Sequence, residues 1–419
     1  MNSPRNTLTR TLAIVLSAVA LTIVSAAANQ AQVAGPLVGT TTASTADLWF
    51  FAPKDAHCEV EALPAEGEAP KSTAELKPIE NLAGKAEGTP RRARLSGLKA
   101  DTAYRYTVTV DGKQHENHQG TFRTQPAPGT PHKLRMVLTS CMKFGQPQDS
   151  WNILLAEKPH LHLTVGDTHY ADTTNPTEQW GHHLRYRRVP QFAQVIRNVP
   201  TYSMWDDHDY GPNDSDGTAK GKENSLAGWQ QFWANPGAGT KQTPGAFYRF
   251  SWGEVDFFVV DGRYHRSPDA HPDNNAKRML GDAQFRWLLA GLKASKAKFK
   301  VIASGSTLFH SSRDGWRIYT FSRHRLLDAI KANKIPGVVY MSGDIHKSLV
   351  REHHESKRVG YPFVEVISSG IANSHDLSFA CVDFDTTAQD PTMRVRIIMG
   401  DKSIKMDKSW KLSELSHKE

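Results

Sequence analysis

The chain has 419 residues, with 51 lysines and arginines against 43 acidic residues and 39% hydrophobic residues. It is long enough for two domains or one large one, and too rich in hydrophobic residues for wholesale disorder. Because the strongly apolar window 12–24 is shorter than the roughly 20 residues that a membrane span needs, a protein with several spans is excluded.

The first 28 residues have the pattern of a secretory signal. Arg5 and Arg10 precede the apolar window, and Ser25 with the three alanines after it follows, as at a signal cleavage site. We expect a Sec-type signal peptide over residues 1–28 and a mature chain that starts near Asn29, in the periplasm or secreted. No transmembrane span would remain after cleavage; an uncleaved anchor is the alternative.

The charge pattern excludes some partners. Loss of two arginines with the signal lowers the formal net charge from +8 to +6, because residues 1–28 contain no acidic residue. This mild basicity favours anionic or phosphorylated substrates only weakly. Since no segment resembles a basic arm, we expect no dedicated nucleic-acid-binding module.

The three cysteines, Cys58, Cys141 and Cys381, lie far apart in the sequence. They lack the close, paired spacing of a disulfide framework, and the odd number leaves at least one thiol unpaired. Cys141 directly follows a strand-like apolar run. Buried packing is the ordinary role of such a cysteine, and a catalytic or metal-binding role needs further support.

The region 33–125 reads as a small β-sandwich. Short alternating segments such as 46–51 and 103–110 are separated by turn-rich stretches. The stretch 95–104 is similar to the entry of a late strand in fibronectin type III or immunoglobulin-like modules, where a tyrosine, here Tyr104, packs at a sheet corner. A proline-rich joint at 125–131 then predicts a boundary before a second domain.

Beyond the joint, strand-like and helix-like segments alternate, which predicts an α/β domain over 132–419. The expected helices are 148–157, 179–197, 225–233 and 282–293. The expected strands are 134–140, 160–165, 202–205, 247–251, 255–260, 299–303 and 337–341. The segment 363–398 returns to strands, so we expect a partly antiparallel sheet.

Four polar clusters come directly after apolar strands of this domain. They are Ser140-Cys141 and the segments 166–172, 205–209 and 342–346. The carboxyl ends of strands are where α/β folds build their sites. One such cluster is often only a turn, but the same placement four times indicates a functional site.

The residue types in these clusters predict a pair of metal ions. Asp, Tyr, His and Cys offer anionic oxygen, imidazole nitrogen and thiolate sulfur, which together suit a trivalent iron beside a hard cation such as calcium. Five of the candidates are anionic and balance one ferric ion plus one calcium: Cys141, Asp167, Tyr170, Asp207 and Asp344. Without metals they would repel one another.

Over roughly 135–369, these clusters resemble the metallophosphoesterase motifs in the variant form of the alkaline phosphatase D family. The segment 260–263, Val-Asp-Gly-Arg, is similar to the family's Asp-x-Arg segment, and 280–288 is similar to its Leu-Gly-x-x-Gln-x-x-Trp-Leu helix start. The resemblance implies a metallophosphoesterase-type β-sandwich flanked by helices. A preceding all-β domain is also usual in this family and in purple acid phosphatases.

The resemblance also implies a ligand set. Ferric iron would be surrounded by Cys141, Asp167, Tyr170 and His346. Asp167 would bridge to calcium, held also by Asp207 and Asp344, with one or two calcium ions in all. Generic metallophosphoesterases have Asn-His at 207–208 and Gly-His-x-His at 343–346. Here oxygen ligands replace imidazoles, which favours calcium over zinc.

Other polar residues near these clusters are candidates for proton transfer, phosphate binding or support of the ligands. His208 is placed to donate a proton to the leaving group or to orient the phosphate. Arg263 would either contact the phosphate or brace Asp261. His169 and Asp172 neighbour ligands and are candidates for supporting them. Ordinary surface or core roles are expected for the histidines His182, His183 and His310.

The expected function is an exported, metal-dependent phosphoesterase, an alkaline phosphatase or phosphodiesterase. It would hydrolyse phosphate esters with a metal-bound hydroxide and form no covalent phosphoenzyme. The substrate would be a small molecule, a phospholipid or a polymer diester. The alternatives are a phospholipase D-type phosphodiesterase and a non-catalytic cell-surface binding module with an inert metal site.

Overall fold

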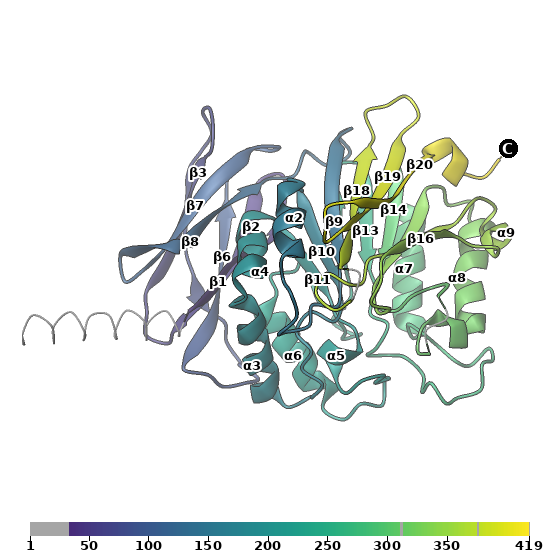
Figure 1. Cartoon of the computed structure of the whole chain (residues 1–419), viewed down its shortest axis with the longest axis horizontal. Coiled ribbons are helices and arrows are strands. Elements are labelled where there is room, and N and C mark those ends of the chain that lie inside the picture. The colour runs from purple at the N-terminus through teal and green to yellow at the C-terminus, as the bar shows by residue number, and fades with distance from the viewer. Residues whose placement is uncertain (1–32, 311–312, 375–376, 419) are drawn as a thin grey trace, which may run out of the picture.

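The computed structural model describes residues 33–310, 313–374 and 377–418, and the expected signal peptide lies outside these ranges. Within them, no helix has the length and apolar character that crossing a membrane requires. An all-β region comes first along the chain and an α/β region follows (Figure 1). This order agrees with the sequence-based expectation.

Two antiparallel four-stranded sheets form the N-terminal region, with strand orders β1-β2-β6-β5 and β4-β3-β7-β8. Every second residue of β3 is buried, as expected when one face of a sheet packs on a core and the other faces water. The strands are β1 (Ala34–Thr41), β2 (Thr45–Pro53), β3 (Cys58–Pro64), β4 (Ser72–Glu75), β5 (Lys77–Pro78), β6 (Gly88–Ser96), β7 (Ala103–Val110) and β8 (Lys113–Arg123).

A tyrosine closes one corner of this region. Tyr104, at the start of β7, is fully buried and stacks on Phe122 with ring centroids 5.4 Å apart. Its hydroxyl accepts a hydrogen bond from the backbone N–H of Lys99 at 2.9 Å. The hydroxyl therefore ties the loop before β7 to the strand, as in the sheet corners of fibronectin-like modules.

Two six-stranded sheets form the α/β region, with strand orders β11-β10-β9-β18-β19-β20 and β12-β13-β14-β15-β17-β16. Parallel pairing joins β9, β10 and β11 in the first sheet and β13, β14, β15 and β17 in the second. The strands are β9 (Lys133–Thr139), β10 (Leu161–Val165), β11 (Thr201–Met204), β12 (Tyr248–Trp252), β13 (Val255–Val259), β14 (Phe299–Ala303), β15 (Val338–Ser342), β16 (Leu349–Glu352), β17 (Val364–Ile367), β18 (Ser378–Asp385), β19 (Thr392–Met399) and β20 (Ile404–Lys411).

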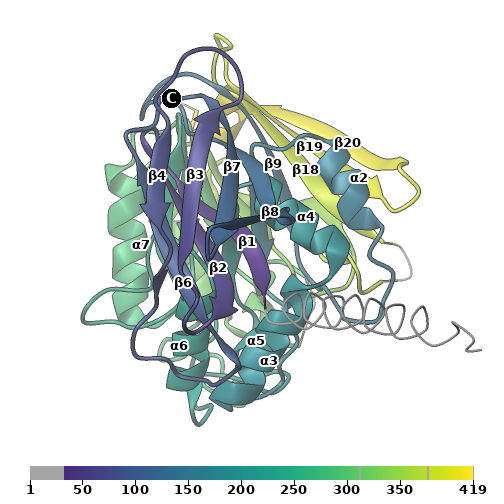
Figure 2. The same ribbon diagram turned by 90° about the vertical axis from the view of Figure 1, so that its left-hand side faces the viewer.

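Helices flank the two sheets. In Figure 1, α3 and α4 lie between the N-terminal sheets and the first six-stranded sheet, and α7 and α8 lie on the opposite side of the molecule; Figure 2 shows the N-terminal sheets face-on. The helices are α2 (Ser150–Ala156), α3 (Pro176–Arg187), α4 (Pro190–Asn198), α5 (Asp207–Tyr210), α6 (Lys222–Phe232), α7 (Asp282–Ala294), α8 (Thr320–Ala332) and α9 (Ser356–Val359), with 3-10 turns η1 (Trp316–Ile318) and η2 (Leu412–Leu415).

The prediction of one helix over 179–197 is wrong. Two helices, α3 and α4, cover this segment, and the break falls at Val189, whose backbone is extended, directly before Pro190. Proline lacks the N–H that a helix interior needs and disfavours helical backbone in the residue before it. It is, however, well suited to the first position of α4.

A buried arginine joins the N-terminal region to the α/β region. The Arg187 guanidinium lies 4.8 Å from the ring centroid of Trp49 and 4.4 Å from that of Trp233. The Trp49 indole N–H donates to the carbonyl of Gln231 at 2.8 Å. Burial lowers the pKa of Arg187 to about 9, so the guanidinium is still charged at neutral pH. The N-terminal sheets thus pack directly on the α/β region.

The carboxyl ends of the parallel strands meet at one edge of the α/β region. The backbone N–H of Gly370, after β17 of the second sheet, donates to the carbonyl of Ser140, after β9 of the first sheet, at 3.3 Å. Within the second sheet, the backbone N–H of Gly343, after β15, donates to the carbonyl of Gly305, after β14, at 3.0 Å. The loops after both sheets are therefore brought together, which is where the four polar clusters lie.

Candidate metal centre

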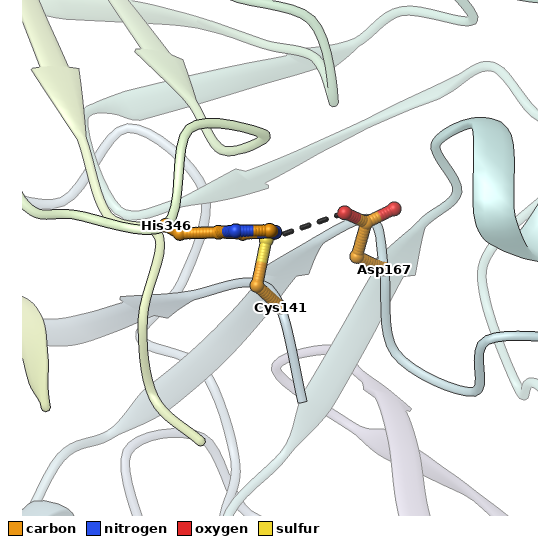
Figure 3. A group of neighbouring side chains, drawn as sticks. All are labelled: Cys141, Asp167 and His346. Carbon is orange, nitrogen blue, oxygen red and sulfur yellow. Dashed lines mark hydrogen bonds between the residues drawn. The ribbon is translucent and has the colours of Figure 1, made fainter. Parts of the chain in front are cut away.

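Three predicted ligands form one compact group. Donor atoms of Cys141, Asp167 and His346 lie within 4.8 Å of one another, and Figure 3 shows their side chains pointing toward one another from three loops. The Cys141 Sγ lies 3.2 Å from Asp167 Oδ2. It also contacts the hydroxyl of Ser369, after β17, at 3.0 Å.

Tyr170 completes this group on its partly exposed side. Its hydroxyl lies 3.4 Å from Asp167 Oδ2. The Asn373 amide nitrogen bridges Tyr170 and His346, at 2.9 Å from the phenol oxygen and 3.0 Å from His346 Nε2. All four residues that the sequence predicts around iron are thus brought together, and Asn373 orients two of them.

Asp167 also belongs to a second group. One of its carboxylate oxygens lies within 4.8 Å of donor atoms of Asp207 and His208. Asp207 Oδ2 accepts the backbone N–H of Asp214 at 2.8 Å. Asp167 therefore stands between the two groups, which is the position that a bridging carboxylate needs.

A third group contains only carboxylates. Donor oxygens of Asp207, Asp214 and Asp314 lie within 4.8 Å of one another. Asp344 lies outside the three groups; its backbone carbonyl oxygen is 3.8 Å from Cys141 Sγ. Asp214 and Asp314 were missed by the sequence analysis because they lie in irregular loops rather than directly after a strand.

The backbone of the site is held in an unusual conformation. Cys141, Asp167, Tyr170, Asp344 and His346 all have positive φ, between 38° and 77°. Non-glycine residues rarely adopt this left-handed region, and such residues concentrate at functional sites, where the surrounding structure enforces the cost. Five of the six predicted metal ligands therefore share a backbone feature that no sequence pattern reveals.

A glycine allows the loops to approach closely. A Cβ added to Gly343, just before Asp344, would lie 2.3 Å from the Ser140 hydroxyl oxygen, so even alanine would push the loops apart. Gly166, just before Asp167, has φ +90° and packs closely against Asp206. A Cβ added to Gly166 would lie 2.4 Å from the Cβ of Asp206. The Gly-Asp pairs are thus required by packing as well as by turn geometry.

The electrostatics of the site call for cations. Burial, together with the charges of Cys141 and Asp207, raises the pKa of Asp167 well above its usual range. Burial and the charge of Asp314 do the same to the pKa of Asp344, and burial raises the pKa of the Cys141 thiol. The site therefore gathers acidic groups without enough positive charge to keep them all ionised.

Arg263 supplies part of the missing positive charge. Its side chain is fully buried; Nε lies 2.5 Å from Asp206 Oδ1, and Nη2 lies 2.5 Å from Asp314 Oδ2 and 3.7 Å from Asp207 Oδ1. Burial raises the pKa of Asp207, but the charges of Arg263 and His208, together with backbone hydrogen bonds, outweigh burial and lower that pKa below its usual value. The guanidinium therefore lies among carboxylates next to the candidate metal ligand Asp207.

His208 lies at the rim of the site. Its Nδ1 contacts Asp172 Oδ1 at 2.6 Å, and its ring centroid is 4.5 Å from that of Tyr170. Burial lowers the pKa of His208, but the charges of Asp207 and Asp172 outweigh it and raise the pKa above its usual value. With Nδ1 engaged by Asp172, Nε2 is the nitrogen available to a ligand.

The other candidate histidines support or lie outside the site. His169 is buried; its Nε2 is hydrogen-bonded to Gln179 at 2.9 Å, and its Nδ1 lies 2.9 Å from Asp209 Oδ1. His183 is buried and stacks on His169 at 3.7 Å between ring centroids. The ring of His182 contacts the His169 carbonyl oxygen at 3.1 Å, and His310 belongs to none of the three donor groups described above.

One further cluster of possible donors, 353–355, does not fit a metal ion. His353 Nδ1 already accepts the backbone N–H of Glu355 at 3.1 Å, which places the proton of the neutral ring on Nε2. Both carboxylate oxygens of Glu355 are bound by Arg323, at 2.7 and 2.9 Å. A cation there would have to displace these bonds.

The donor sets of the first three groups do fit metal ions. Cysteine, histidine, tyrosine and carboxylate donors suit iron, and carboxylates alone suit a hard cation such as calcium. Among the described residues, Asp167 Oδ1 and Asp344 Oδ2 are buried and have no hydrogen-bond partner. Since buried carboxylates are normally satisfied, these two oxygens fit a site that would bind cations.

The fold is that of a metallophosphoesterase. The chain resembles the solved structure of PhoD, with a TM-score of 0.69 at 18% identity over 93% of each chain. It also resembles a purple acid phosphatase from yellow lupin (Lupinus luteus), with a TM-score of 0.65 at 15% identity over 90% of this chain and 74% of the other. The predicted fold class, an all-β region before a metallophosphoesterase-type α/β region, is confirmed.

Residues 136–396 match the model of the PhoD-like phosphatase family, and the chain belongs to this family. It is also 24% identical over 338 residues to alkaline phosphatase D of Bacillus subtilis (strain 168), which covers 65% of this chain. The chain spans 57% of the length of that relative. The resemblance read from the sequence is thereby confirmed, and family membership implies metal ions without specifying iron or calcium.

Proposed function

We propose that the protein is an exported hydrolase of phosphate esters that works with ferric iron and calcium. When bound, these cations would activate the attacking water and neutralise the charge that develops on the phosphoryl group. Membership of the PhoD-like phosphatase family supports the reaction class. The signal-like residues 1–28 support export, which N-terminal sequencing of the mature protein tests by a start near Asn29.

One observation carries the proposal of a metal pair: Asp167 belongs to two donor groups at once. Its Oδ2 faces Cys141, while its Oδ1 is buried without a partner among the described residues. A single carboxylate between two donor groups is the arrangement that holds two cations side by side. In our assignment, Cys141, Tyr170 and His346 hold iron, and Asp207 and Asp344 hold calcium.

The chain itself contributes positioning and proton transfer. Asn373 fixes the orientation of Tyr170 and His346, and Arg263 positions Asp207 from behind. Asp172 accepts a hydrogen bond from Nδ1 of His208, and the raised pKa of this histidine favours the imidazolium. In that protonated form Nε2 also carries a proton, which the departing oxygen can take.

Ser140, by contrast, is buried against Cys141, with its hydroxyl 3.4 Å from Sγ. It therefore has no exposed hydroxyl to act as a covalent nucleophile.

A substrate panel on natively purified, metal-loaded protein tests this function. We expect hydrolysis of p-nitrophenyl phosphate, bis-p-nitrophenyl phosphate or both, because His346 is exposed and Tyr170 and His208 are partly exposed. Hydrolysis of phospholipid headgroups alone would assign a phospholipase D-type diesterase instead. Retained metal with no turnover of any ester would contradict catalysis and leave a binding module.

A further inference from the structure

An exposed aromatic side chain adjoins the candidate metal centre. Phe144 follows Cys141 by three residues in the loop after β9, and 48% of its surface is exposed. The other large exposed hydrophobic side chains of the described ranges lie in the N-terminal region, in α8 and in β20: Leu63, Leu82, Phe321 and Ile404. Single exposed hydrophobic residues are common, so the argument depends on how this one is held.

The loop that carries Phe144 is fastened to the loops of the metal centre. The backbone N–H of Met142 donates to the Asp167 carbonyl at 2.8 Å, and that of Lys143 donates to the Ala372 carbonyl at 3.3 Å. Ala372 directly precedes Asn373, which contacts Tyr170 and His346. The backbone directly before Phe144 is therefore fastened to the loops that carry the proposed iron ligands.

Helix α3 fixes the other side of the Phe144 residue. The Tyr186 hydroxyl accepts the backbone N–H of Phe144 at 2.8 Å, and the two rings meet edge to face at 5.8 Å between centroids. The Arg185 guanidinium lies 5.3 Å from the centroid of the Phe144 ring, over its face. Arg185 and Lys143 are both exposed, so two positive charges accompany the ring.

We propose that Lys143, Phe144 and Arg185 form an aromatic subsite that binds a planar group, an aryl ring or a nucleobase, on the alcohol part of the phosphate ester. This inference rests on the proposed function, because it assigns a substrate class to the same centre. Planar groups stack on aromatic rings and on guanidinium planes. The positive charges of Lys143 and Arg185 attract the anionic ester and would not favour a planar group that carries positive charge.

Two esters with the same kind of leaving oxygen isolate this effect. AMP and glycerol 3-phosphate are both monoesters of a primary alcohol, so the chemical step makes the same demand and only AMP carries a base. Stacking of one base on an aromatic side chain changes affinity by about five- to hundredfold. In Phe144→Ala, we expect the ratio of kcat/KM for AMP to that for glycerol 3-phosphate to fall about tenfold, mainly through KM.

Two further variants control the comparison. Phe144→Trp keeps an aromatic face and should retain the ratio. Phe321→Ala removes an equally exposed phenylalanine of α8 and should leave the ratio unchanged. An unchanged ratio in Phe144→Ala, or an equal fall in Phe321→Ala, overturns the aromatic subsite while hydrolysis by the wild type upholds the phosphoesterase.

Calorimetric binding separates the subsite from turnover. In the metal-loaded protein, Phe144→Ala should weaken AMP binding about tenfold relative to inorganic phosphate. If the wild type hydrolyses neither ester, the proposed monoesterase activity fails. The ratio of the dissociation constants for AMP and inorganic phosphate then decides by itself whether the aromatic subsite exists. An equal effect on AMP and on inorganic phosphate would refute stacking.

Discussion

The role of Arg263 can be decided by replacing it with methionine. The guanidinium is fully buried and lies 2.5 Å from both Asp206 and Asp314. Removing one partner of a buried ion pair leaves an uncompensated charge and costs about 3–5 kcal/mol. At roughly 2 °C per kcal/mol for a large domain, we expect the melting temperature of Arg263→Met to fall by about 6–10 °C.

The same variant should lose turnover. Asp207 lies 3.7 Å from Arg263, so loss of the guanidinium allows this proposed calcium ligand to move, and kcat should fall more than KM rises. Melting followed by circular dichroism, together with kcat and KM, checks both effects. If Arg263→Met does not fold, Arg263→Lys, which keeps the charge but not the fork that reaches two carboxylates, provides the measurement.

A matched control is Arg286→Met, which replaces an exposed arginine of α7 and should change the melting temperature little. The alternative is that Arg263 contacts the phosphate of the substrate. An unchanged melting temperature with a raised KM would favour that alternative and refute the positioning role.

Three further predictions follow from the site and the fold. Chelation of calcium should abolish activity, and added calcium should restore it, because Asp207 and Asp344 offer an oxygen-rich site that exchanges readily; activity that survives exhaustive chelation would exclude that site. His208→Ala should slow hydrolysis of alkyl esters by about 10²–10⁴-fold and of nitrophenyl esters much less, because only a poor leaving group needs the proton; equal losses would assign His208 to orientation. Tyr104→Phe should cost about 1–3 kcal/mol, measured by urea denaturation, because the buried hydroxyl accepts from Lys99; an unchanged stability would show that this corner bond contributes nothing.

The sequence predicts the centre because its ligands directly follow buried strands. Asp167 comes two residues after β10, and Asp344 two residues after β15. The carboxyl ends of strands are where α/β folds build their sites, so these positions mark candidate residues. The two strands belong to different sheets, and contacts between the loops after both sheets bring the residues together. Tyr104 was likewise predictable, since a sheet corner has a local sequence pattern.

The remaining parts of the site depend on contacts between distant segments. Asp314 lies far beyond the end of β14 and pairs in the site with Arg263 and Arg266. Ser369 and Asn373 follow β17, and nothing in their sequence marks them as neighbours of Cys141 and Tyr170. The positive φ values of the ligands also result from tertiary packing, which local sequence patterns do not encode.

Helix prediction failed for a different reason. The predicted helix 179–197 contains Pro190, and the backbone is extended at Val189, directly before it. Helix α8 was not predicted. Its buried face is only partly apolar, because it contains Ser322 and Arg323 as well as Leu326, Leu327 and Ile330. Here tertiary packing rather than local pattern determines the helix.

Metal content of Cys141 variants tests the central claim most directly. Iron and calcium per chain and the visible spectrum should be measured on natively purified wild type, Cys141→Ser and Cys58→Ser, the last being a buried thiol in the N-terminal sheets. If Cys141 and Tyr170 both bind ferric iron, the wild type is coloured, Cys141→Ser loses iron and colour, and Cys58→Ser keeps both. A Cys141→Ser protein with full iron content and an unchanged spectrum would contradict the proposed metal centre.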